Sequence, residues 1–434
     1  MKKILSWVLL VAMLLTSSTA ALAENEKIKI VFQHSMEEHV WEAMRGTIEQ
    51  FMIDNPNIEV ECVHGGTYNE SVAKMMTVHA AALQGDKNGY PTIHQTVLGS
   101  LATFAESGVI APLDDLFKAT GFPIDKYFEG MRQAYSYNGI AYGVPSFASV
   151  APTMYYNKTL AEEAGATVPQ TWDEMEAWLE KLTVKDEDGN TTRYALGIAG
   201  WDATYFAPIF WQQGSEPFLD EECTQVGFGT EEAIATIKML KDWVDKGYVK
   251  WYYSANASNA SSDLRQSYID GTCASVFHTC SMYSVYKPAL AQNGWEVGVA
   301  FPPAGVKSLS YMGGSGLTIT ALSTDAEKEA ALKLILALTG AEPNMALIEA
   351  TGYLPVSQMA QESDLYDTWV NENPELLGLY DHLDEVIAPP SNALWSQLAK
   401  KWVSAMALIL QEGADIDSTV ETLVEECNEI LADF

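Results

Sequence analysis

The chain has 434 residues, and because 48% of them are hydrophobic it can build two cores. It carries 58 acidic and 25 basic residues, a formal net charge of −33, which repels nucleic-acid backbones and anionic lipid headgroups. We therefore exclude nucleic acid as a partner and attribute the charge to solubility.

Residues 1–23 have the pattern of a secretory signal. Lys2 and Lys3 precede a short apolar run, and small residues end in Ala-Leu-Ala before Glu24. The run is too short to span a bilayer comfortably, although a retained membrane anchor is the alternative. No cysteine follows it for lipid attachment. We expect cleavage after Ala23 and a periplasmic or extracellular mature protein.

The first part of the mature chain alternates strands and helices. The stretch KIKIVF predicts a strand, the next segment has one apolar helical face, and Asn55-Pro56 stops that helix before the strand IEVECV. A helix over residues 70–84, a strand around TIHQTVL and a helix from about Ser100 continue the pattern. This alternation predicts an α/β fold with a parallel sheet and helices on both faces.

The stretch SYNGIAYGVPS contains an Asn-Gly pair between extended arms, which predicts a hairpin. A second α/β region follows. Its helices are expected to begin at Thr171 and to run over 230–246, and SSDLRQSYID leads past Gly271 into the strand CASVFH. A third region begins at SYMGGSGLTIT, with a helix opened by Thr324 and Glu327.

Three segments mix extended residues with glycine or proline, as hinge strands do: residues 142–146, 301–316 and 350–357. Three crossings mean that two lobes share the chain discontinuously and can move around a cleft. We predict the following division: a signal peptide at 1–23, lobe 1 from 24–144 and 311–350, and lobe 2 from 145–310 and 351–434. In the stretch ATGYLPVS, Gly352 and Pro355 end a helix, and Tyr353 is expected to face the cleft.

The five cysteines form no Cys-x-x-Cys motif. An exported chain can oxidise a pair, and Cys273 and Cys280 are the closest in sequence. They flank one expected strand, so their side chains can also point apart. Both a Cys273–Cys280 disulfide and free buried thiols remain open.

Motifs for catalysis and metal binding are scarce. The seven histidines have no metal-ligand spacing, and neither G-x-S-x-G nor a Walker A loop occurs. Ser71 and Lys74 match S-x-x-K, but its companion motifs are absent. We predict no catalytic residue, no metal and no cofactor. A secreted glycoside hydrolase is the alternative, and it requires two cleft carboxylates roughly 5 to 10 Å apart, for which Glu70 and Asp202 are candidates.

Aromatic residues in loop contexts are more informative, since aromatic faces beside hydrogen-bonding groups suit sugars and polyols. They are Trp201, Tyr205, Trp211, Tyr252, Tyr253 and Trp395. Core packing is the alternative for each of them, and the loop around Gly200 and Asp202 favours the cleft for Trp201.

Several motifs together are similar to those of extracellular solute-binding proteins of ABC importers, in the carbohydrate-uptake group. They are HSM, GGTYNES, YYNK, YIDGTCA, GGSG and ATGYLPVS, in this order over nearly the whole mature chain. The glycerol-3-phosphate-binding branch resembles the chain most. The resemblance implies a two-lobed periplasmic-binding-protein fold, a monomer that is not an enzyme, and closure on a small hydrophilic solute that is delivered to a membrane permease. The solute would be a sugar, a polyol or a glycerol-3-phosphate-like ester.

The resemblance also implies ligand contacts at Tyr68, Glu70, Ser149, Trp201, Gly314 and Tyr353. Structural alternatives exist for two of these residues. Gly314 can serve a tight crossing, and Glu70 can complement the dipole of a helix N-terminus.

Three positions depart from the branch. Thr204 or Tyr205 replaces a second loop tryptophan, and a serine expected after CASVF falls near Thr279 and Cys280. The arginine that grips phosphate corresponds to Gln397.

A glutamine supplies only neutral donors, whereas phosphate requires charge-assisted donors or a helix N-terminus. Lys400 or Lys401 could substitute for that arginine as a looser partner. We therefore also consider a neutral saccharide or polyol as the solute.

Overall fold

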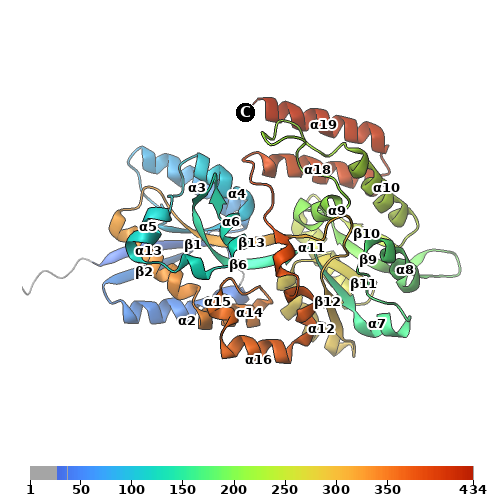
Figure 1. The fold of residues 1–434 in the computed structure, drawn as a ribbon, viewed down its shortest axis with the longest axis horizontal. Helices are drawn as coiled ribbons and strands as arrows, with labels where there is room; N and C mark the ends of the chain where they lie inside the picture. Colours follow the sequence, from blue (N-terminus) through green and yellow to red (C-terminus); the bar gives the residue numbers. More distant parts are fainter. Residues whose placement is uncertain (1–26, 37, 434) are drawn as a thin grey trace, which may run out of the picture.

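Two β-sheets, one in each of two lobes, form the frame of the chain (Figure 1). The computed structural model describes residues 27–36 and 38–433, so the signal sequence expected at residues 1–23 lies outside the described residues. The predicted α/β class and the two-lobed architecture are confirmed. The boundaries assigned to the two lobes stay a prediction.

The first sheet has the strand order β14-β13-β3-β1-β2, with β6 paired to β13. As the alternation of strands and helices predicts, β1 is parallel to β2 and to β3. Strand β13 is antiparallel to β3 and to β6. The strands are β1 (Ile28–His34), β2 (Ile58–His64), β3 (Ile93–Val97), β6 (Gly143–Ala151), β13 (Ser310–Ile319) and β14 (Val386–Ile387).

Helices flank this sheet, and α2, α3, α4, α13 and the end of α14 lie where the sequence predicts them. They are α2 (Glu38–Asp54), α3 (Tyr68–Leu83), α4 (Leu98–Glu106), α5 (Asp114–Thr120), α6 (Glu129–Ala134), α13 (Asp325–Leu338) and α14 (Ala341–Thr351). The predicted capping box of α13 is confirmed, with Thr324 and Glu327 each bonding the other's backbone. Helix α14 ends at Gly352, whose φ of 86° a glycine adopts without steric strain.

The second sheet has the order β10-β9-β11-β7-β12, with β8 at β9. Strands β9, β10 and β11 are parallel, whereas β7 and β12 are antiparallel members. The strands are β7 (Thr153–Asn157), β8 (Val184–Lys185), β9 (Thr191–Ala199), β10 (Val249–Tyr252), β11 (Cys273–His278) and β12 (Val297–Ala300).

Helices α8 and α10 begin after Thr171 and Thr230, as the sequence predicts. The helices around the second sheet are α7 (Lys158–Glu163), α8 (Trp172–Leu182), η2 (Ala203–Tyr205), α9 (Ala207–Gln212), α10 (Glu231–Asp245), α11 (Ala257–Ile269), α12 (Tyr283–Gln292), α18 (Trp395–Leu410) and α19 (Ile416–Ala432). Short helices α15 (Gln358–Gln361), α16 (Asp364–Glu372), η4 (Pro374–Leu376) and α17 (Leu377–Tyr380) precede α18.

Strand β6 passes between the two lobes, since only Pro152 separates it from β7 in the second sheet (Figure 1). The predicted hairpin comes just before it, with strands β4 (Ser136–Tyr137) and β5 (Ile140–Ala141) around Asn138 and Gly139 at φ 50° and 75°. The stretch ATGYLPVS lies against β6, because the Leu354 N–H donates to the Ala148 carbonyl at 2.9 Å.

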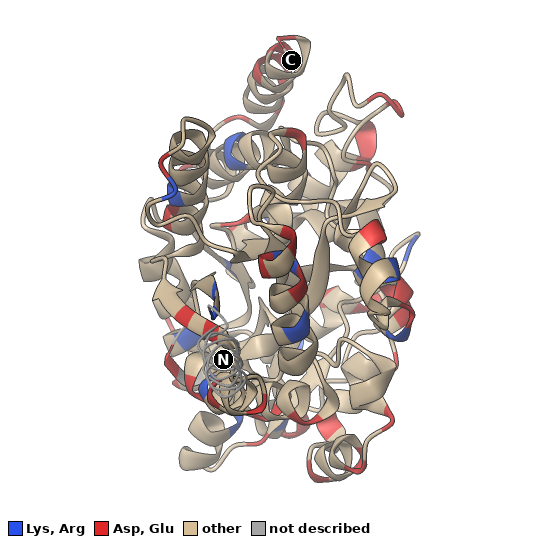
Figure 2. Cartoon of the chain, turned by 90° about the vertical axis from the view of Figure 1, so that its left-hand side faces the viewer, with Lys and Arg blue, Asp and Glu red and all other residues tan. Residues whose placement is uncertain are grey.

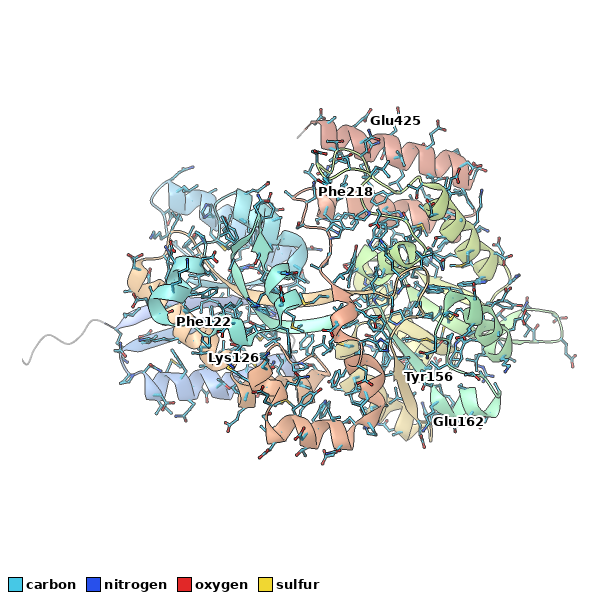
Figure 3. All side chains as sticks on the ribbon, in the orientation of Figure 1. Phe122, Lys126, Tyr156, Glu162, Phe218 and Glu425 are labelled. Atoms are coloured by element: carbon cyan, nitrogen blue, oxygen red, sulfur yellow. The ribbon has the colours of Figure 1, made fainter. Side chains whose placement is uncertain are left out.

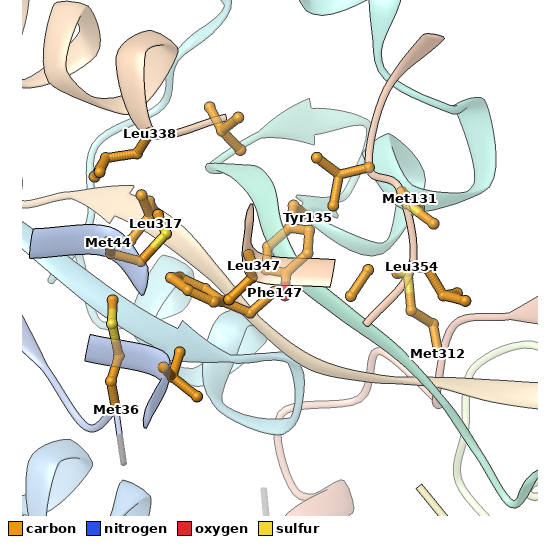
Figure 4. Close-up of a cluster of buried hydrophobic side chains, with 14 of the residues drawn as sticks. Met36, Met44, Met131, Tyr135, Phe147, Met312, Leu317, Leu338, Leu347 and Leu354 are labelled. Atoms are coloured by element: carbon orange, nitrogen blue, oxygen red, sulfur yellow. The ribbon is translucent and has the colours of Figure 1, made fainter. Parts of the chain in front are cut away.

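Both lobes have packed cores (Figure 3). Figure 4 shows Phe147 of β6 and Leu317 of β13 among the buried side chains of the first lobe. In the second lobe, Trp402 of α18 is fully buried and stacks on Phe228 with ring centroids 4.4 Å apart. All five cysteines are free thiols, so the Cys273–Cys280 disulfide is not formed.

The charged residues lie on the surface elements, and acidic residues occur on many of the helices (Figure 2). Over the described residues, no single helix is both long and apolar enough to cross a membrane, and one bent pair, α13 with α14, has the length and composition to do so.

Candidate solute-binding site

Four of the predicted site residues, Tyr68, Glu70, Trp201 and Tyr205, lie just beyond the carboxyl ends of parallel strands in the two sheets. In open α/β sheets, ligands bind at this edge, where loops lead from strands into helices. Tyr68 begins α3 shortly after β2 ends, and Trp201 and Tyr205 follow the end of β9. The topology therefore places residues of both lobes at the edge that suits a ligand.

The first-lobe side of the site is a hydrogen-bonded group of Tyr68, Gln95 and Ser315, which we call the polar wall. The amide Nε2 of Gln95 donates to the Ser315 Oγ at 2.8 Å and to the Tyr68 hydroxyl at 3.3 Å. The two hydroxyl oxygens lie 3.5 Å apart. Gln95 and Ser315 are buried, whereas Tyr68 is partly exposed. The wall thus presents the Tyr68 phenol on a buried polar support.

Glu70 has a structural role at the start of α3. Its carboxylate accepts hydrogen bonds from the Thr67 backbone N–H at 2.8 Å and from the Thr67 hydroxyl at 2.9 Å, which completes a capping box. The hydrogen bond from the Thr67 backbone lowers the pKa of Glu70, and the Thr67 hydroxyl adds to this effect. The helix-terminus alternative is confirmed, and a ligand contact of Glu70 stays a prediction.

The second-lobe side is a group of three rings, Trp201, Tyr205 and His278, which we call the aromatic wall. The Trp201 ring lies 5.3 Å from that of Tyr205 and 5.8 Å from that of His278, and the Tyr205 and His278 rings stack at 5.5 Å. Burial, with a smaller contribution from Arg265, lowers the pKa of His278 to about 3, so this imidazole is neutral at pH 7. Its Nδ1 forms a 3.0 Å hydrogen bond with the Tyr286 hydroxyl.

Tyr68 of the polar wall contributes to the electrostatics of Tyr205 in the aromatic wall. Burial raises the pKa of Tyr205, and the Asp202 carboxylate and the Tyr68 phenol raise it further. The two tyrosines follow strands of different sheets, Tyr68 after β2 and Tyr205 after β9.

Ser149, Gly314 and Tyr353 lie at the crossing between the lobes. Ser149 of β6 pairs with Gly313 of β13. Gly314 has a φ of 93°, and a Cβ there would lie 1.8 Å from the Phe147 carbonyl oxygen, so the tight-crossing alternative for Gly314 is confirmed. Tyr353 is half-buried and packs edge-to-face on Phe147, with ring centroids 6.4 Å apart.

Gln397 lies in the first turn of α18 and is exposed. Within the described part of the chain, no hydrogen bond joins its side chain to either wall. Lys401, one turn further on, forms a 2.6 Å ion pair with Glu426 of α19, a hydrogen bond that raises the pKa of Lys401. Because this ion pair holds Lys401 between α18 and α19, Lys401 is a poor substitute for the phosphate-binding arginine that the resemblance places at Gln397.

Two cavities are formed elsewhere. One of about 570 Å³ lies beside β12 and is lined by Lys158, Lys287 and Trp295 among others. Another of about 150 Å³ lies between α4 and residues 388–392. None of the eight predicted site residues lines either cavity, so hydrogen bonds and ring contacts alone define the candidate site.

Gln95, Ser315 and His278 were not predicted as site residues. Each lies inside or at the end of a strand, where periodicity indicates burial but not a neighbour from a distant segment. Ser315 reaches Gln95 only because β13 pairs antiparallel with β3. A polar residue inside or at the end of a buried strand, such as the central Gln95 of IHQTV or the final His278 of CASVFH, was the available signal.

The fold is that of a two-lobed solute-binding receptor. The chain belongs to the bacterial extracellular solute-binding protein family, whose sequence profile matches residues 46–376. The family description places such proteins outside the cytoplasm, in the periplasm or extracellularly. The chain is a receptor of the kind that serves ABC importers of sugars and glycerophosphates, as predicted.

Three relatives illustrate the range of this similarity. The sn-glycerol-3-phosphate-binding periplasmic protein UgpB of Pectobacterium atrosepticum is 23% identical over 364 residues, which cover 80% of this chain and 77% of the relative. A maltotriose-binding protein of Pyrococcus abyssi is 25% identical over 417 residues, 93% of this chain and 83% of the relative. The structure of UgpB from Mycobacterium tuberculosis with glycerophosphocholine has a TM-score of 0.77 at 25% identity, covering 93% of this chain and 98% of that one.

Proposed function

We propose that the chain captures a small hydrophilic solute between the polar wall and the aromatic wall and delivers it to the permease of an ABC importer. The observation that carries this proposal is the position of Tyr68 after β2 of one sheet and of Tyr205 after β9 of the other, beyond the carboxyl ends of parallel strands in each sheet. Hydroxyl donors on one side and ring faces on the other suit a sugar, a polyol or a glycerophosphate-like ester.

The lobes that close on the solute are proposed to be residues 24–144 with 311–350 and residues 145–310 with 351–434. Closure needs no new fold, because β6 and β13 already pass between the sheets and can bend at their ends. The proposed ligand contacts are Tyr68, Glu70, Ser149, Trp201, Tyr205, Gly314, Tyr353 and Gln397. We further propose that the receptor acts as a monomer.

We propose that the protein catalyses no reaction on its solute. The two carboxylates that the hydrolase alternative requires both hold the ends of helices: Glu70 caps α3, and Asp202 accepts the Thr204 backbone N–H at 2.8 Å at the start of η2. A general acid of a glycosidase has a raised pKa, whereas hydrogen bonds lower that of Glu70. The relatives named above are binding proteins.

The charge of the solute is the open part of this proposal. Arg265 of α11 makes no ion pair with any described acid and contributes to the lowered pKa of His278, so its positive charge lies near the aromatic wall. An anionic group on a solute would be attracted there, although Gln397 offers no charge. We therefore test both a phosphate ester and a neutral saccharide.

The test is a thermal-shift screen of the mature protein against glycerol-3-phosphate, glycerophosphocholine, maltotriose and glycerol. A ligand that binds only the folded state stabilises it by mass action and so raises the melting temperature. At a ligand concentration of one hundred times its Kd, the free energy of unfolding rises by about 2.7 kcal/mol. A rise with the phosphate esters assigns an anionic solute, and a rise with maltotriose alone assigns a neutral saccharide. A Tyr205→Ala variant must lose the shift, and an unchanged shift in that variant would contradict the proposed site.

A further inference from the structure

We propose that His34, Trp41 and His64, which we call the ring shelf, form a second solute subsite on the first lobe, and that the solute is a neutral saccharide of two or more rings. This inference rests on the proposed function, because it takes the two walls as the place where the first ring of the solute binds. It goes further by naming the residues that hold the next ring and by choosing the neutral over the anionic solute.

The ring shelf lies next to the polar wall at the carboxyl edge of the first sheet. His34 is the last residue of β1 and His64 the last of β2, and the two are register partners in this parallel pair. Strand β1 lies between β2 and β3, so the shelf begins one strand spacing, about 4.8 Å, from the strand that carries Gln95. Ser35, directly after His34, donates its backbone N–H to the Gln95 Oε1 at 2.8 Å. A solute at the polar wall can therefore extend its next ring onto the shelf.

The Trp41 ring is the platform of the shelf. Trp41 is the fourth residue of α2, and its ring stacks on that of His34 with centroids 4.6 Å apart and planes that differ by only 5°. The His64 ring meets the His34 ring edge-on at 5.4 Å. His34 is only 5% exposed, whereas Trp41 is partly exposed and His64 is exposed. His34 thus supports the Trp41 ring from the protein side, and the accessible part of the indole can pack on the C–H face of a sugar ring.

The shelf also carries N–H donors that have no formal charge. The Met36 backbone N–H donates to His34 Nδ1 at 3.3 Å, and because a backbone N–H can only donate, the proton of the neutral imidazole lies on Nε2. Burial, with a smaller contribution from His64, lowers the pKa of His34 to about 4, so this ring is neutral at pH 7. The Trp41 indole N–H donates to no residue in the described part of the chain and is not among its buried unpaired atoms, so it is open to solvent. Both N–H groups suit the hydroxyl oxygens of a sugar.

A metal ion fits the ring shelf less well. His64 Nδ1 accepts the Gly66 backbone N–H at 3.2 Å, just as His34 Nδ1 accepts that of Met36. A metal bound at either Nε2 would leave the ring proton on Nδ1, where it would face a backbone N–H, donor against donor.

An anion also lacks what it needs at the shelf. Anions bind through charge-assisted donors, and the basic residue on the Trp41 side of α2 is Arg45, four positions further along the helix. The Arg45 guanidinium is already paired, with Glu42 at 2.8 Å and with Glu49 at 3.9 Å. A ring platform with neutral donors and no available cation favours a neutral, hydroxyl-bearing ring.

The first experiment is NMR of the mature protein labelled with [¹⁵Nε1]tryptophan, titrated with glucose, maltotriose, cellotriose and glycerol-3-phosphate. The Trp41 indole resonance is identified by its loss in Trp41→Phe. We expect a bound trisaccharide to move this resonance, and glucose or glycerol-3-phosphate, which end at the walls, to leave it in place. The Trp295 resonance is the internal control, since this tryptophan is also partly exposed but belongs to neither wall nor shelf.

Calorimetry gives the second readout. We expect Trp41→Ala to weaken the binding of a trisaccharide by about tenfold or more, as the loss of an aromatic contact does, and to leave the affinity for glucose unchanged. Trp41→Phe, which keeps a ring and loses the N–H, should weaken trisaccharide binding less. Trp295→Ala is the matched control and should change neither affinity.

The outcomes separate this inference from the proposed function. If glycerol-3-phosphate binds and Tyr205→Ala removes that binding, but no trisaccharide binds, the inference is overturned while the proposed function stands. A trisaccharide that binds without moving the Trp41 resonance overturns the ring shelf and leaves the two walls, and this readout uses the wild-type chain, so it decides even where Trp41→Ala does not fold. If no probe binds, the inference is overturned and the proposed function loses its support as well.

Discussion

The two walls of the candidate site differ in what holds them and in what they can offer a solute. The polar wall is a set of directed hydrogen bonds around Gln95, whose amide is oriented by the backbone N–H of Ser35 so that its nitrogen donates to Tyr68 and Ser315. The aromatic wall is a set of ring faces 5.3 to 5.8 Å apart around His278. Ring contact tolerates many solutes, whereas directed hydrogen bonds reject those with the wrong polarity. We infer that the aromatic wall supplies affinity and the polar wall supplies discrimination.

The largest effect is expected from Tyr353→Ala at the crossing between the lobes. Removing this ring takes away a contact that both lobes would share on closure, so we expect a loss of affinity of about 100-fold or more, the size of a binding hot spot. The melting temperature of the solute-free protein should change little, because Tyr353 is only half-buried. Calorimetry and thermal unfolding on the same samples measure both quantities.

A large drop in melting temperature without solute would show instead that the packing of Tyr353 on Phe147 is a structural contact. Tyr353→Phe is the matched control, since it keeps the ring and removes only the hydroxyl.

Trp201→Ala tests the aromatic wall. We expect affinity to fall by about 10- to 100-fold, roughly 1.4 to 2.7 kcal/mol, and by a similar factor for every solute that binds. Trp201→Phe, which keeps an aromatic ring, should retain most of the affinity. If Trp201→Ala changes the preference among solutes more than the affinity, the inference that the aromatic wall supplies affinity and the polar wall supplies discrimination is wrong.

The sequence predicts the helices and strands that carry the two walls better than it predicts which side chains make up each wall. The capping box at Thr324 and the glycine end at Gly352 are local signals, and both are confirmed. The Gln95–Ser315 contact is not local, because it depends on which strand lies beside β3 and in which register. Because the two strands lie more than 200 residues apart in the sequence, the residues around Gln95 and Ser315 do not indicate that these strands pair.

The same limit applies to Cys273 and Cys280. Their spacing left a disulfide open. In the structure, Cys273 begins β11, whereas Cys280 lies two residues after the strand ends at His278, and each thiol contacts a different partner. The Cys273 thiol lies 3.4 Å from the Tyr252 hydroxyl, and the Cys280 thiol accepts the Val150 N–H at 3.2 Å.

Buried histidines allow a comparison of the two lobes by pH. Burial lowers the pKa of His94 in the first lobe to about 4 and that of His278 in the second lobe to about 3. An unfolded histidine has a pKa near 6.5, so the unfolded chain binds these protons first as the pH falls. Stability is therefore complete above pH 6.5 and is lost between pH 6.5 and about 3, by up to about 1.4 kcal/mol per pH unit for each histidine.

Thermal unfolding from pH 7.5 to 4.5 checks this expectation. His278→Gln and His94→Gln should each reduce the fall in melting temperature between pH 7.5 and 4.5. His64→Gln, at an exposed histidine, serves as the matched control. Equal pH profiles for all three variants and the wild type would contradict the assignment of buried neutral histidines.

The smallest effect is expected from Gln397→Arg, which asks whether α18 takes part in the polar wall at all. A guanidinium in the first turn of α18 could bind a phosphate through two N–H groups, whereas Gln397→Lys adds the same charge at a single point. If α18 reaches the solute, Gln397→Arg should raise the affinity for glycerol-3-phosphate by up to about tenfold, which corresponds to one charge-assisted hydrogen bond. Gln397→Lys should raise it less, and the affinity for maltotriose should not rise with either variant. Equal gains for Gln397→Arg and Gln397→Lys that vanish in high salt would show long-range attraction by an exposed charge, and no gain would remove Gln397 from the site.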